Sequence, residues 1–146
     1  MVNNKKGFTL VEMIIVLGLT VALMIIGYQP MKKALFNYQE KIFFTNLQRN
    51  WDKAAERAIE DGCRYLFLFE KGTNKIYVRK TDRNGILTEE ELIMPKSLQL
   101  YKTRKIRISQ QGSVTGDTVT FVSNSGKTYV YTFQLGYGAR YNVLEK

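Results

Sequence analysis

An apolar run over residues 8–28, FTLVEMIIVLGLTVALMIIGY, restricts this chain more than any other feature of its sequence. A helix rises about 1.5 Å per residue, so these 21 residues span about 30 Å, the thickness of a bilayer's hydrocarbon layer. A helix buried in a soluble core normally keeps a polar face, and this run carries a single charge, on Glu12. We therefore predict that the run forms a membrane-inserted helix.

Two other kinds of N-terminal segment share part of this pattern. A cleaved secretory signal peptide needs a shorter apolar stretch and a small-x-small cleavage site. Thr20, Val21 and Ala22 form a weak version of that site, but the apolar run continues to Ile26 without a polar break. An ordinary signal-anchor helix fits the length equally well. Two lysines precede the run and two follow it, so the positive-inside rule leaves the orientation open.

Glu12 lies four residues into the apolar run. An ionised carboxylate at the centre of a bilayer costs about 2–3 kcal/mol or more, and such residues are usually functional. One interpretation places Glu12 near the interface, where the cost is small. The other gives it a cationic partner, which must come from another chain or from a new N-terminus because the run itself holds none.

Residues 5–12, KKGFTLVE, resemble the type IV pilin and pseudopilin signature, a basic leader ending in glycine followed by the FTLxE pattern and a long apolar helix. The resemblance implies that a prepilin peptidase cleaves after Gly7 at the cytoplasmic face and that the new terminal amine of Phe8 is N-methylated. It also implies a single-pass protein of the cytoplasmic membrane whose C-terminal head lies outside and enters a cell-surface filament. The implied partners are other pilin and pseudopilin subunits and the pilus assembly machinery.

Glu12 would then attract the terminal ammonium of a neighbouring subunit during filament assembly, or bond its own terminus. Opposite charges attract strongly in a medium of low dielectric constant, so such a pair favours one register along the filament. Loss of the leader removes two lysines and no acid, which lowers the net charge from +9 to +7.

A second helical segment follows the apolar run. We expect Pro30 to kink the helix rather than end it, because the helical pattern resumes and no proline or glycine occurs over residues 31–61. Phe43, Leu47, Trp51, Ala54 and Ala58 recur at spacings typical of one helix face, with Gly62 as a natural stop. The predicted organisation is a leader (1–7), a transmembrane and filament-core helix (8–29), an amphipathic half of the same helix (30–61) and a β-rich head (62–146).

The remainder of the chain predicts strands separated by turns, and therefore an α+β head in which the amphipathic helix packs on an antiparallel β-sheet. Residues 86–94, with their acidic run Glu89, Glu90 and Glu91, are expected to form short strands around an exposed loop. The other expected strands cover residues 65–69, 76–79, 98–101, 105–109, 118–122, 128–134 and 141–144.

Composition excludes several kinds of catalytic and metal site. The chain has no histidine, which rules out Ser-His-Asp and Cys-His catalysis and histidine-ligated metals, and its single cysteine rules out an intrachain disulfide. We expect no enzyme, metal or cofactor. Cys63 is interpreted as a buried small hydrophobe, with a link between subunits as the alternative.

Arg79, Arg104, Lys105 and Arg107 lie near Tyr77 or Tyr101 in the sequence. Basic side chains neutralise phosphates and tyrosines stack on bases, so these residues form a candidate DNA contact. A solvated basic face, or a contact with an acidic neighbouring subunit, is the simpler interpretation.

The tail resembles a narrower group. Residues 116–121, GDTVTF, and 131–141, YTFQLGYGARY, are similar to the C-terminal region of ComGD-type competence pseudopilins of Gram-positive bacteria. The resemblance implies a minor pseudopilin of a competence pilus, a structural subunit required for uptake of extracellular DNA. A secretion-system or adhesive pilin, and a membrane-anchored DNA-binding module, remain the alternatives.

Overall fold

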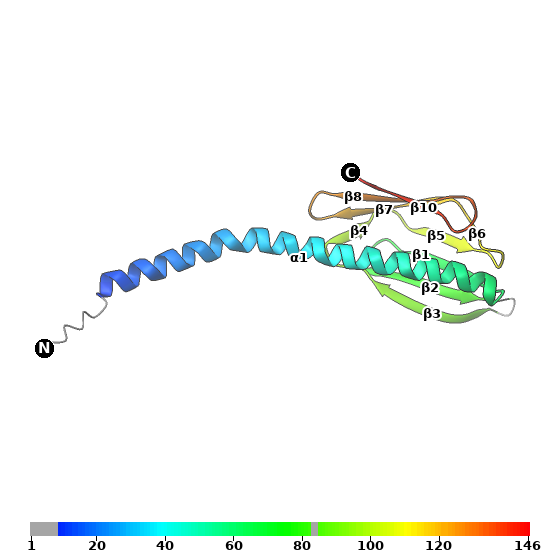
Figure 1. The fold of residues 1–146 in the computed structure, drawn as a ribbon, viewed down its shortest axis with the longest axis horizontal. Coiled ribbons are helices and arrows are strands. Elements are labelled where there is room, and N and C mark those ends of the chain that lie inside the picture. The colour runs from blue at the N-terminus through cyan, green and yellow to red at the C-terminus, as the bar shows by residue number, and fades with distance from the viewer. Residues whose placement is uncertain (1–8, 83–84) are drawn as a thin grey trace, which may run out of the picture. The chain divides into compact units, whose positions relative to one another are not determined.

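The computed structural model describes residues 9–82 and 85–146, except the side chains of Gln29 and Tyr137. The chain divides into two compact units, Met1–Leu35 and Phe36–Lys146, and one helix, α1 (Leu10–Glu60), belongs to both (Figure 1). The helix continues through Pro30, as expected, and a kink there stays a prediction. After the helix ends, Gly62 adopts a φ of 60°, a left-handed conformation that glycine reaches without a Cβ clash.

The ten strands found among the described residues all lie in the second unit, and each strand pair is antiparallel. One sheet has six strands in the order β3-β2-β1-β5-β6-β9, and the other has four in the order β10-β8-β7-β4. The strands are β1 (Arg64–Phe69), β2 (Lys75–Thr81), β3 (Ile86–Ile93), β4 (Leu98–Leu100), β5 (Arg104–Ile108), β6 (Ser113–Val114), β7 (Asp117–Ser123), β8 (Thr128–Phe133), β9 (Gly136–Tyr137) and β10 (Tyr141–Glu145).

The amphipathic part of α1 packs against both sheets and closes one continuous core. The five apolar residues predicted to share a helix face are all buried. Phe44 contacts Phe121 and Tyr131 of the four-stranded sheet, with ring centroids 5.4 Å and 5.3 Å away. Trp51 lies 4.9 Å from Phe67 of the six-stranded sheet and 4.4 Å from Phe133 of the other. Phe43, Phe44 and Trp51 are therefore core residues.

The predicted α+β class is confirmed, and two details differ from the expected sequence of strands. The head has two antiparallel sheets where one was expected, because the chain alternates between them and β5 pairs with β1 of the six-stranded sheet. Residues 86–94 contain one strand, β3, rather than short strands around a loop. Pairing with β2 makes this possible, because Lys75 and Arg79 offset the charges of Glu91 and Glu89 on the same side of the sheet.

Candidate functional site

The N-terminal end of α1 carries the first group of candidate site residues. Gly7 and Phe8, the expected cleavage and methylation positions, lie outside the described residues. Thr9 precedes the helix, and its Oγ1 accepts a hydrogen bond of 3.3 Å from the Glu12 backbone N–H. A threonine three residues before a glutamate has the spacing of a capping box, which satisfies the free N–H groups at a helix start.

The carboxylate of Glu12 lies in the first turn of α1 and is exposed. A negative charge here interacts favourably with the helix dipole. Among residues 9–82 and 85–146, no ion pair involves Glu12. Local structure therefore accounts for a glutamate at this helix start and leaves its carboxylate available to a cation from outside the described residues.

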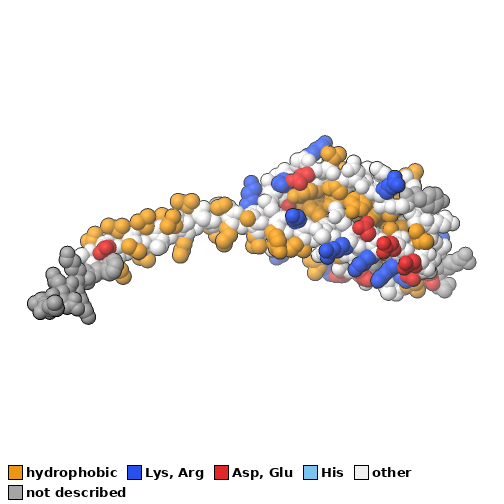
Figure 2. Space-filling model, viewed as in Figure 1, with side chains coloured by type: hydrophobic (Ala, Val, Ile, Leu, Met, Phe, Trp, Pro, Cys, Tyr) orange, Lys and Arg blue, Asp and Glu red, His pale blue; other side chains and the backbone are white. Residues whose placement is uncertain are grey.

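The helix surface that follows Glu12 is apolar on every side. The large hydrophobic side chains over residues 10–26 are between 49% and 78% exposed, and Figure 2 shows hydrophobic side chains along the visible side of this part of the helix. By length and composition, α1 is able to cross a membrane. So much exposed apolar surface requires lipid or another protein around it.

The four candidate DNA-contact residues do not form a single group. Successive side chains of a strand point to opposite faces, so Lys105 and Arg107 share one face of the six-stranded sheet while Arg104 alternates to the other. Strand register places Arg79 and Arg107 on either side of Leu66. Arg79 forms an ion pair with Glu89, and Arg104 Nε lies 3.5 Å from Asp117 Oδ1, whereas Lys105 and Arg107 are exposed. On the side visible in Figure 2, acidic and basic side chains are interspersed over the head.

Cys63 is a buried free thiol whose Sγ lies 3.4 Å from the Asp61 carbonyl oxygen. This position agrees with the interpretation as a small buried side chain.

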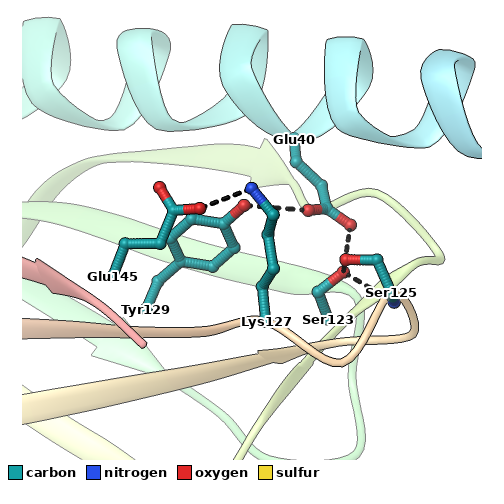
Figure 3. Close-up of polar contacts among 6 residues, drawn as sticks. All are labelled: Glu40, Ser123, Ser125, Lys127, Tyr129 and Glu145. Carbon is teal, nitrogen blue, oxygen red and sulfur yellow. Dashed lines mark hydrogen bonds and ion pairs between the residues drawn. The ribbon is translucent and has the colours of Figure 1, made fainter.

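A buried carboxylate, Glu40, is a feature that the sequence analysis missed. Its side chain is 1% exposed and points from α1 toward the turn between β7 and β8 (Figure 3). The Ser123 hydroxyl donates to Glu40 Oε1 at 2.7 Å, and the Tyr129 hydroxyl donates to Oε2 at 3.3 Å. Burial, followed by the nearby charge of Glu40, raises the pKa of Tyr129. Helical spacing could have predicted that Glu40 faces the core, because it lies three and four residues before the buried Phe43 and Phe44.

Neighbouring polar groups complete the cluster around Glu40. The Ser125 backbone N–H donates to Ser123 Oγ at 3.1 Å, and Lys127 pairs with Glu145 of β10 at the margin of the cluster (Figure 3). These bonds attach one turn of α1 to the β7–β8 hairpin, so Glu40 positions the helix on the sheet.

Comparison with known proteins finds a matching sequence motif and a similar solved structure. Residues 2–28 match the family model of the prokaryotic N-terminal methylation motif. The solved structure of the minor pseudopilin EpsH from the type 2 secretion system of Vibrio cholerae is similar to the chain, with a TM-score of 0.58 and 15% sequence identity. The alignment covers 73% of this chain and 96% of that one. The chain has a pseudopilin fold.

No curated protein sequence shows significant similarity to this pilin-like chain. The chain therefore combines a prokaryotic N-terminal methylation motif with a pseudopilin-like fold, and its N-terminal helix is long and apolar enough to cross a membrane.

Proposed function

We propose that the chain is a minor pseudopilin that acts as a structural subunit of a type IV competence pilus and is required for uptake of extracellular DNA. The observation that carries the pilin part is the match of residues 2–28 to the methylation motif together with the exposure of the apolar helix segment from Leu10 to Tyr28 that this match includes. The competence part rests on the resemblance of residues 116–121 and 131–141 to ComGD-type pseudopilins.

In this proposal the prepilin peptidase cleaves between Gly7 and Phe8, the new Phe8 amine is methylated, and the head lies outside the cytoplasmic membrane. The Glu12 carboxylate then receives the terminal ammonium of a neighbouring subunit. Two features support that role: Glu12 is exposed, and large apolar side chains surround it, so packing of a second subunit would transfer the pair into a medium of low dielectric constant.

A secretion-system pseudopilin is the second candidate, and the similarity to a type 2 secretion subunit favours it. A membrane-anchored DNA-binding module is supported less well, because Arg79 and Arg104 already have acidic partners. Lys105 and Arg107 stay as the proposed DNA or partner contacts of the head.

An in-frame deletion in the host, scored by uptake of DNase-resistant labelled DNA, tests the competence function. We expect uptake to be lost, to return with the wild-type gene, and to stay absent with Glu12→Ala. Undiminished uptake in the deletion strain would reassign the subunit to secretion or adhesion. If Glu12→Ala entered sheared filaments at the wild-type level, the proposed role of the charge pair in assembly would be refuted.

A further inference from the structure

Strand β3 forms a free edge of the six-stranded sheet. Among the described strands it pairs with β2, and its other side has no partner. Seven of its eight residues are exposed, including Ile86 at 60%, Leu87 at 50% and Ile93 at 75%. An edge strand presents a row of unpaired N–H and C=O groups that can accept another strand.

Two cavities follow one another between this edge and α1. The first, of about 390 Å³, lies between Ile42 and Asn46 of the helix and Leu92 and Ile93 of β3. The second, of about 380 Å³, lies between Lys53 and Arg57 of the helix and the facing side of the sheet, where Tyr65 of β1, Val78 of β2, and Thr88 and Glu90 of β3 line it. The order along the helix is the reverse of the order along β3, so the two cavities follow one another along this strand, and we call the pair the β3 trough.

The two ends of the β3 trough differ in chemistry. Ile42, Phe43 and Leu92 make the first end apolar. At the second end, Lys53 and Arg57 take part in none of the ion pairs found in the described part of the chain. They outnumber the single unpaired acid there, Glu90, so this end favours an incoming carboxylate.

We propose that the β3 trough is a docking site for an extended, acid-bearing segment of a partner protein, which adds a strand antiparallel to β3. Its apolar side chains would pack near Ile42 and Leu92, and a carboxylate would reach Lys53 and Arg57. Backbone bonds to the edge would supply affinity, while the two ends of the trough would set direction and register. This inference uses only the geometry of the head and does not depend on the competence function.

A second copy of β3 fits this edge poorly. Antiparallel pairing of β3 with itself around Glu90 would bring the acidic run of one copy against the same run of the other. Like charges directly opposite one another destabilise a strand pair. The same run therefore protects the edge from self-association and leaves it open to a segment of suitable charge.

A synthetic eight-residue peptide tests the proposal on the full chain in detergent micelles. In the fluorescent probe every second residue is threonine, and the residues between the threonines are two valines followed by two glutamates. An antiparallel pairing with β3 then places the glutamates near Lys53 and Arg57. A second peptide replaces both glutamates with lysines, and a third keeps the glutamates but carries N-methyl groups on alternate amides. Fluorescence anisotropy measures the three affinities.

We expect the glutamate peptide to bind about tenfold more tightly than the lysine peptide, a factor that corresponds to about 1.4 kcal/mol. The N-methylated peptide should not bind, because it cannot form the strand ladder. Lys53→Glu should reverse the preference between acidic and basic peptides, whereas the matched Lys41→Glu, an exposed change on α1 outside the trough, should not. Equal affinities of the first two peptides, retained binding of the third, or no binding of the glutamate peptide would each overturn the proposal.

Discussion

Trp51 anchors α1 at the junction of the two sheets, and its replacement should destabilise the head. The side chain is 1% exposed, its ring contacts one phenylalanine from each sheet, and its indole N–H donates to the Ala139 carbonyl oxygen at 2.7 Å. A fully buried tryptophan replaced by alanine costs about 3–5 kcal/mol. Since a domain of this size has about 5–15 kcal/mol of stability in all, Trp51→Ala should remove a large part of it.

Trp51→Phe tests the contribution of the hydrogen bond to stability separately from most of the contribution of ring packing. Phenylalanine keeps an aromatic ring but leaves the carbonyl of Ala139, a residue only 6% exposed, without its donor. An unsatisfied buried polar group costs about 1–3 kcal/mol, and the lost ring atoms add to this, so we expect a loss of about 2–4 kcal/mol.

Urea titration of the full chain in detergent micelles, followed by near-ultraviolet circular dichroism, measures these losses through the shift in the unfolding midpoint. Arg49→Ala, an exposed change on the same helix, serves as the control and should shift the free energy of unfolding by less than about 0.5 kcal/mol. A change that small for Trp51→Phe would refute the assigned role of the bond to Ala139.

Three further changes test separate parts of the molecule. Gly7→Val should block processing, because a bulkier residue should not fit the cleavage site, and a mature mass beginning at Phe8 would contradict this. Burial, and then the nearby Tyr141, raise the pKa of Tyr131, so above about pH 10 the unfolded chain releases a proton that the folded chain keeps. The free energy of unfolding should then fall by up to about 1.4 kcal/mol per pH unit because of this group. Urea titrations at a series of alkaline pH values should show a shallower fall for Tyr131→Phe than for the wild type, and equal slopes for the two proteins would refute the assignment. Gly112→Ala should lower the unfolding midpoint, because residue 112 has a φ of 74°, a left-handed conformation that strains a residue with a Cβ; an unchanged midpoint would contradict this.

Helical periodicity predicted α1 and its buried face well, because that signal is local. The apolar positions from Phe43 to Ala58 follow one helix face, and glycine at position 62 supplies the stop. Strand positions followed similarly from alternation of side chains. The two short strands β6 and β9 gave no such signal, since a two-residue strand contains no repeat.

Strand partners were not accessible from the same patterns. Alternation indicates which side chains of β5 face inward, but not that Leu66 of β1 lies opposite Arg107. This pairing decides the arrangement of the candidate basic residues, which appeared as one cluster in the sequence. In the structure the pairing brings Arg79 and Arg107 to either side of Leu66, while Arg104 lies on the opposite face and pairs with Asp117.

Glu40 shows how a polar residue on a buried helix face depends on distant parts of the chain. Burial of a carboxylate is costly unless hydrogen bonds replace those to water. The donors that do so, Ser123 and Tyr129, follow 83 and 89 residues later in the chain. The helix pattern alone indicates that position 40 is buried, while its partners exist only after β7 and β8 have paired. Correct seating of α1 is thus coupled to formation of that hairpin, and the buried charge disfavours any other register of the helix on the sheet.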